Sequence, residues 1–174
     1  GIYVSRACGK NTRRLVFKQF FRLGREIMDQ YESSLARICL ELGGISVFYE
    51  DNVPEDFAIP SLYFPPAEQA PSGSALNSYQ LKYSIYAKVF ALTRREAGEL
   101  AGKIVKGIMD RQCRLPVFNE DGTDSGMIIK LDPPASWIVD EGMAQVTLTY
   151  RLVKSITSVE LPAASSVGIN KYYD

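Results

Sequence analysis

Residues 78–110 constrain the fold more than any other part of the chain, because a long alternating strand runs directly into a helix. Between positions 79 and 91 the odd residues are all apolar or aromatic, namely Tyr79, Leu81, Tyr83, Ile85, Ala87, Val89 and Ala91. The even positions are mostly polar, so this pattern predicts a strand with one face buried and the other towards water.

A capped helix is predicted directly after this strand. Thr93 and Glu96 have the spacing of a capping box, and Leu92 and Ala97 are placed to form the accompanying hydrophobic staple. The apolar residues that follow recur at steps of three and four: Ala97, Leu100, Ala101, Ile104, Val105, Ile108 and Met109. They form one stripe, which we expect to pack on the strand face that carries Tyr79, Leu81, Tyr83 and Ile85. The whole unit is scaffold, without a nucleophile–base pair or a cofactor loop.

The rest of the chain supplies one further helical pattern and several strand patterns. The helical pattern begins at about Asn11 or Thr12, runs to Leu42 and ends at Gly43 and Gly44. The strand patterns cover residues 45–50, 59–64, 114–118, 127–131 and 143–154. Residues 67–77 are rich in Ser, Gly, Ala and Pro and predict an exposed loop.

This order of elements predicts an α+β fold, with a mostly antiparallel sheet and helices packed on one face. We expect a single domain over residues 1–174, with an N-terminal arm at 1–10, an α+β core at 11–156 and an extended C-terminal tail at 157–174.

Composition lowers the expectation of an enzyme. The chain has no histidine, which removes the commonest general base and the commonest metal ligand. Its three cysteines, Cys8, Cys39 and Cys113, are widely spaced and contain no C-x-x-C pair, which is typical of a reducing compartment. Apolar runs are only a few residues long, so no membrane span is expected. We therefore predict no catalytic residue, no metal and no cofactor.

Charge is distributed unevenly although it sums to zero. Residues 1–25 hold seven of the 20 Lys and Arg and none of the 20 Asp and Glu, so the remainder carries 13 basic and 20 acidic residues. One interpretation is a solvated helix face with a mobile terminus. The other is a basic end that meets an acidic neighbour or a phosphate backbone, in which case the interacting residues would be Arg13, Arg14, Lys18 and Arg22.

Three polar clusters could be taken for a metal, catalytic or phosphate site, but each has a simpler structural explanation. The acidic residues around Asp121 and Gly122 lack the spacing of a cation loop and fit the turn of a hairpin at 119–126. The carboxylates Asp51, Glu55 and Asp56 lie in a polar loop with prolines, so solvation is favoured over paired acid–base catalysis. The sequence Ser72-Gly73-Ser74 lacks the lysine of a phosphate loop and is linker-like.

Aromatic residues on the predicted strands allow two interpretations. Tyr86 lies between Lys82 and Lys88 on the even face, an arrangement compatible with stacking of single-stranded bases. Packing in the core or at a subunit interface is the favoured alternative. Trp137 could anchor a partner or close one end of the core.

Several short sequence motifs and the order of the elements resemble those of the tail terminator, or tail completion, proteins of long-tailed bacteriophages. The resemblance spans about residues 26–156 and rests on PSLYF at 60–64, YSIY at 83–86 and VTLTY at 146–150, each at its place in the order of elements. It implies a structural virion protein without catalytic residues, forming a ring, commonly hexameric, that caps the tail tube and offers a docking surface to the neck or head.

The partners that the resemblance implies are further copies of the chain, the tail tube protein, a head–tail connector or neck protein, and a sheath if the tail is contractile. DNA would pass through the lumen without specific binding. The implied location is the virion tail or neck, and the host cytoplasm during assembly.

Exposed loops carry most recognition, so the expected contact elements are the two termini, residues 67–77 with Ser72 and Gly73, and the hairpin tip with Asp121 and Gly122. Trp137 joins them as a candidate anchor. The alternatives are another connector or neck component, a nucleic-acid-binding module that uses the basic first 25 residues, and a carboxylate-based enzyme.

Overall fold

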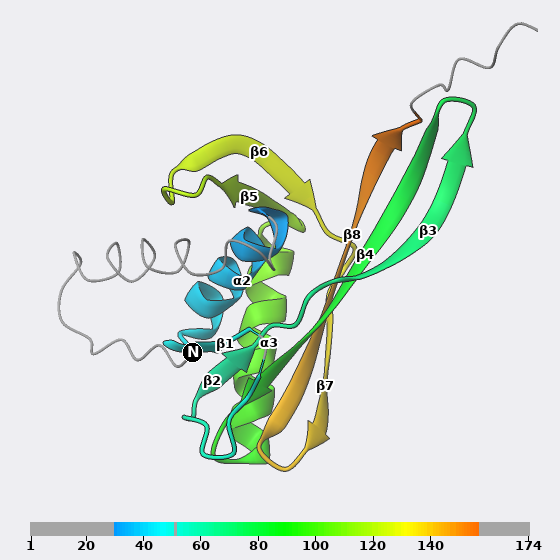
Figure 1. Ribbon diagram of the computed structural model, residues 1–174. Helices are drawn as coiled ribbons and strands as arrows, with labels where there is room; N and C mark the ends of the chain where they lie inside the picture. Colours follow the sequence, from blue (N-terminus) through cyan, green and yellow to red (C-terminus); the bar gives the residue numbers. More distant parts are fainter. Residues whose placement is uncertain (1–29, 51, 157–174) are drawn as a thin grey trace, which may run out of the picture.

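The computed structural model describes residues 30–50 and 52–156, which form two helices and eight strands (Figure 1). In chain order the elements are α2 (Gln30–Gly43), β1 (Val47–Tyr49), β2 (Ser61–Tyr63), β3 (Glu68–Ala75), β4 (Ser78–Phe90), α3 (Arg94–Asp110), β5 (Arg114–Phe118), β6 (Asp124–Lys130), β7 (Ala135–Asp140) and β8 (Met143–Ser155). The arm at 1–10, the predicted helical residues 11–29 and the tail at 157–174 lie outside the described residues.

One large sheet organises the molecule. Its strand order is β1-β2-β4-β8-β7, and β3 pairs with the N-terminal half of β4. The pair β1–β2 is parallel and every other pair is antiparallel. Both helices lie on the same side of this sheet (Figure 1), which confirms the predicted α+β architecture. Neither described helix is long and apolar enough to cross a bilayer.

Strands β4 and β8 pair over thirteen positions, from Ser78 opposite Ser155 to Phe90 opposite Met143. A strand of that length spans about 43 Å, whereas the 17 residues of α3 span only about 26 Å. The helix therefore covers one half of the strand pair. In that half the predicted alternation is confirmed, with Tyr83, Ile85, Ala87 and Val89 buried on one face.

The other half of the strand pair projects past the helices (Figure 1). Here the expectation that Tyr79 packs under the second helix is wrong, because 40% of its surface is exposed. Leu81 is half-buried at the boundary. The sequence pattern is uniform along the strand, and only the shorter length of the helix separates a covered half from an uncovered one.

The cap of α3 forms largely as predicted. Thr93 Oγ1 accepts a hydrogen bond from the Glu96 amide at 3.2 Å, and Glu96 Oε2 accepts one from the Leu92 amide at 3.2 Å. The staple is wrong, since Leu92 is 74% exposed while Ala97 is fully buried. Beyond the cap, the buried side of the helix consists of Ala97, Ala101, Ile104 and Ile108.

Helix α2 packs against α3 and against the hairpin formed by β5 and β6. Its buried residues include Leu35, Ile38 and Cys39. Complete burial raises the pKa of the Cys39 thiol to about 12, so this cysteine is a neutral core residue at physiological pH. Gly44, in the left-handed region at φ +66°, ends the helix where the two glycines predicted an end.

Two strands differ from the expectation. The predicted loop at 67–77 is largely strand β3, and β7 was not predicted. Both consist mostly of exposed residues, and β3 is rich in Ser, Gly, Ala and Pro, so neither shows the alternation that marks a half-buried strand. Pairing with β4 and β8 imposes their conformation. Strand β6 also starts three residues before the predicted position 127.

Candidate assembly surfaces

One exposed surface is a projecting three-stranded arm, which we call the finger. It comprises β3, the β3–β4 turn, residues 78–82 of β4 and residues 151–155 of β8 (Figure 1). All eight residues of β3 are exposed. The apolar side chains Leu76, Tyr79 and Val153 lie here at 94%, 40% and 66% exposure. Val153 stands opposite Gln80, so it lies on the other face of the sheet from Tyr79, and each face of the finger carries an exposed apolar side chain.

Ser72 and Gly73 lie on the outer strand of the finger. Ser72 Oγ donates to Gln80 Oε1 at 3.1 Å, and the register between β3 and β4 shifts between Pro71 and Gly73. The predicted exposure of these residues is confirmed, whereas their predicted loop conformation is wrong. They lie in a β-bulge, a device that interrupts the regular edge of a sheet.

The hairpin tip that contains Asp121 and Gly122 folds back on the molecule. Asp121 Oδ1 accepts hydrogen bonds from the amide and the hydroxyl of Thr123, at 2.8 and 2.6 Å, and Gly122 has a φ of +83°. These contacts bear out the turn interpretation. Arg37 of α2 donates to the Gly122 carbonyl at 3.0 Å and places its guanidinium 3.9 Å from the centroid of the Phe118 ring. These two contacts of Arg37 hold the hairpin tip against helix α2.

Trp137 belongs to the sheet face opposite the helices, which we call the open face. It stands opposite Gln145 of β8, which in turn stands opposite Lys88 of β4, so their side chains share one side of the sheet. Its neighbour Ile138 points the other way, towards α3, where its Cδ1 lies 3.3 Å from the position of a Cβ built on Gly98. Trp137 is 47% exposed. It therefore does not close one end of the core, and its role as an anchor for a partner stays a prediction.

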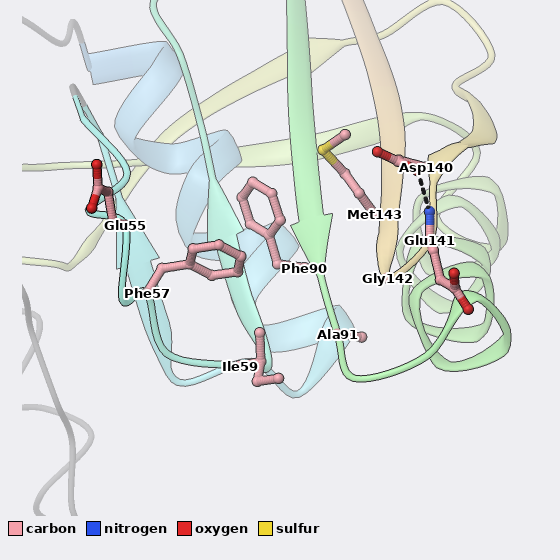
Figure 2. Close-up of a pocket in the computed structure, with 9 residues that line it drawn as sticks. All are labelled: Glu55, Phe57, Ile59, Phe90, Ala91, Asp140, Glu141, Gly142 and Met143. Atoms are coloured by element: carbon pink, nitrogen blue, oxygen red, sulfur yellow. Dashed lines mark hydrogen bonds between the residues drawn. The ribbon is translucent and has the colours of Figure 1, made fainter.

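A pocket of about 430 Å³ opens at the end of the open face, one row of side chains away from Trp137. We call it the basal pocket. Three segments line it: the β1–β2 connection, the end of β4 and the β7–β8 turn (Figure 2). The lining residues are Glu55, Phe57, Ile59, Phe90, Ala91, Asp140, Glu141, Gly142 and Met143. The rings of Phe57 and Phe90 meet with centroids 4.7 Å apart and form an apolar wall.

A tight turn holds one side of the basal pocket. Gly142 has a φ of +75°, and a Cβ built on it would come within 2.7 Å of the Ala91 carbonyl oxygen. Ala91 also donates its amide to the Gly142 carbonyl at 2.9 Å. Only glycine fits this close approach, and the turn presents Asp140 and Glu141 at the rim (Figure 2).

The remaining candidate residues are dispersed. Glu55 lies in the basal pocket and Asp56 is an exposed loop residue, while Asp51 lies outside the described residues. Arg13, Arg14, Lys18 and Arg22 lie outside them as well. Among residues 30–50 and 52–156 no group of three potential metal ligands lies together.

Comparison with known proteins gives the family. The chain is 31% identical over 114 residues to the uncharacterized protein YqbJ of Bacillus subtilis (strain 168), an alignment that covers 66% of this chain and 78% of YqbJ. This chain belongs to the YqbJ family. The phage-like element PBSX protein XkdJ of the same bacterium is 23% identical over 70% of this chain and 84% of its own length.

Two other comparisons add less. No family model matches the chain. Among solved structures, a chain from the virion of the native gene transfer agent (GTA) particle covers 71% of this chain and 93% of its own, with 12% identity and a TM-score of 0.43. A TM-score at that level does not establish a shared fold.

Sequence reasoning missed the basal pocket, because its three segments are far apart in the chain. Sequence patterns place Glu55 in a polar loop and Ala91 on the buried face of a strand, and neither indicates a pocket. The one available signal was the sequence Asp140-Glu141-Gly142 between two strand patterns, which is a turn signature.

Proposed function

We propose that this protein is a structural component of a phage-type virion, where it acts as the tail terminator. In this proposal several copies, commonly six in this class of protein, form a ring that caps the completed tail tube and presents a docking surface to the neck or head. The observation that carries the proposal is the similarity to XkdJ, a protein of a phage-like element, over 84% of its length.

The geometry supports an assembly role over a catalytic one. The finger projects away from the helices and carries exposed apolar side chains, and the open face carries Trp137 and the basal pocket. We assign the finger to the contact along the tail axis, with the tube or the neck, because it extends beyond the body of the subunit (Figure 1). Lateral contacts between copies then fall to the body, which can close into a ring through head-to-tail interfaces.

The proposed partners are further copies of the chain, the tail tube protein and a head–tail connector or neck protein, with a sheath if the tail is contractile. DNA would cross the lumen without specific binding. The proposed location is the tail or neck of the virion, reached from the host cytoplasm during assembly. Another connector or neck component is the nearest alternative, and the position of the protein in assembled particles distinguishes the two.

The test combines light scattering and negative-stain microscopy of the purified full-length protein, alone and with tail tubes from the same genome. Rings, or rings that appear once tubes are added, are expected. A strictly monomeric protein that ignores tail tubes would overturn the proposal.

A matched pair of variants tests the assignment of the finger. Replacing Leu76, Tyr79 and Val153 by Ser should abolish binding to tubes or necks and leave the ring intact. The control replaces three comparably exposed apolar residues of the body, Met109, Met127 and Ile128, by Ser. Equal loss of binding in both variants would refute the assignment.

A nucleic-acid-binding function stays a prediction. The open face does carry Lys82, Lys88 and Tyr86 on one side of the sheet, and the basic first 25 residues add charge. Salt-sensitive binding of DNA that disappears when Arg13, Arg14, Lys18 and Arg22 become Ala would favour it.

A further inference from the structure

The basal pocket and the neighbouring Trp137 form an apolar surface that no described element covers. Helices α2 and α3 lie on the opposite side of the sheet (Figure 1). Ile59, just before β2, is 44% exposed, and Trp137 and Val139 of β7 are 47% and 46% exposed. Apolar side chains gathered around a pocket mark a surface that is covered in the working state of a protein.

The rim of this surface is acidic. Glu55 lies in the β1–β2 connection at one end of the pocket, and Asp140 and Glu141 lie in the β7–β8 turn at the other end (Figure 2). Asp56 adds a fourth exposed carboxylate in the same loop as Glu55. Within the described residues none of these four side chains is in an ion pair. A cation, Lys88, lies in the next row of the open face. The rim therefore favours a cationic ligand with apolar side chains.

The chain itself contains a segment of that chemistry. Residues 13–25 carry five cations, Arg13, Arg14, Lys18, Arg22 and Arg25, and no acidic residue. Between them lie Val16, Phe17, Phe20, Phe21 and Leu23. Basic residues interleaved with phenylalanine complement an aromatic pocket with carboxylates at its rim, through charge and through burial of apolar surface.

The point where this segment joins the body favours a neighbouring copy over the same copy. Gln30, the first residue of α2, is held at the hairpin β5–β6, where its Nε2 donates to the Phe118 carbonyl at 3.0 Å. That position belongs to the helical layer, whereas the basal pocket belongs to the opposite face of the sheet. Only residues 26–29 link the segment 13–25 to Gln30, and they span at most about 18 Å when extended, so the basal pocket of the adjacent copy must lie close to this point.

We propose that the basal pocket, with Trp137, binds the basic segment 13–25 of an adjacent copy and so forms the lateral contact of the ring. This inference rests on the proposed function, because it supplies the contact that closes the assembly. It commits to a protein ligand, since the acidic rim would repel the phosphates of a nucleic acid.

Charge reversal in full-length protein tests the contact. One variant carries Arg13, Arg14, Lys18 and Arg22 as Glu, and a second carries Glu55, Asp140 and Glu141 as Lys. Each alone should lose the ring in sedimentation velocity. An equimolar mixture should recover it, because the acidic segment of the first variant meets the basic pocket of the second, and the basic segment of the second meets the acidic pocket of the first. The control reverses three exposed carboxylates of the two helices, Glu41, Glu99 and Asp110, and should assemble as the wild type does.

The outcomes separate this inference from the proposed function. Rings in both single-site variants would overturn the inference and leave the proposed function standing. Recovery only when both changes are in one chain, and none on mixing, would also overturn it, because the contact would then lie within one copy. A wild-type protein that never forms rings, even with tail tubes, would overturn the proposed function first.

A second measurement does not depend on assembly and uses the single tryptophan of the chain. A synthetic peptide of residues 11–27 is titrated onto the full-length variant whose basic segment is reversed. We expect a saturable blue shift of Trp137 fluorescence that weakens at least tenfold in affinity when Glu55, Asp140 and Glu141 are also reversed. No shift, or an equal shift with a single-stranded oligonucleotide, would contradict the proposal.

Discussion

The two halves of the β4–β8 strand pair show how one sequence pattern can serve two purposes. In the base, residues 83–90 of β4 lie under α3, and their odd positions form the centre of the core. In the finger, residues 78–82 continue the same alternation with no helix above them. The pattern of a strand therefore specifies which side can be buried, and the neighbouring elements decide whether it is buried. The difference predicts that stability resides in the base and that the finger contributes surface.

Amide hydrogen exchange measures the largest expected contrast. Amides of Ile85 and Ala87 should exchange only through global unfolding, whereas those of Tyr79 and Leu81 should exchange through local opening, at a free energy lower by about 3 kcal/mol or more. Equal protection along β4 would show that finger and base form one cooperative unit.

Removal of a core side chain should separate the two regions next. Ile104, fully buried in α3, should cost about 2–5 kcal/mol of unfolding free energy when changed to Ala. Leu76, at 94% exposure in the finger, should change stability by no more than about 0.5 kcal/mol on the same substitution. Urea denaturation of both variants measures this, and a comparable loss for Leu76→Ala would mean that the finger is packed against something in solution.

Two glycines of α3 give the smallest contrast and test how tightly the base is packed. A Cβ on Gly107 would overlap the Leu42 side chain of α2, so Gly107→Ala should destabilise by about 1–3 kcal/mol. Gly102 has no atom within 4 Å of its Cβ position, so Gly102→Ala should stabilise the helix by about 0.5–1 kcal/mol. Thermal denaturation should show opposite shifts. Stabilisation by both substitutions would mean that α2 yields readily and that the base is less rigid than its packing indicates.

The predictable part of the fold is the part with strong local periodicity. The strand at 79–91, the capped helix after it and the strand at 143–154 all follow from patterns that their own residues carry, and they form the base. Strands β3 and β7 could not be found this way, because their residues are mostly exposed and their conformation comes from register with β4 and β8. The basal pocket was hidden for a related reason, since Glu55, Phe90 and Glu141 meet only after the sheet has formed.

The bulge in β3 affects how readily the exposed edge of the finger can pair with another chain. Beyond β3 on one side, and beyond residues 151–155 of β8 on the other, the described part of the finger has no further strand. Unpaired edge strands of this kind can pair with a strand of another chain, which leads to aggregation. The β3 edge is less able to pair, because Pro71 has no amide hydrogen to donate and the register beside it is irregular. This irregular edge therefore disfavours pairing of two copies through β3 before the proposed assembly takes place.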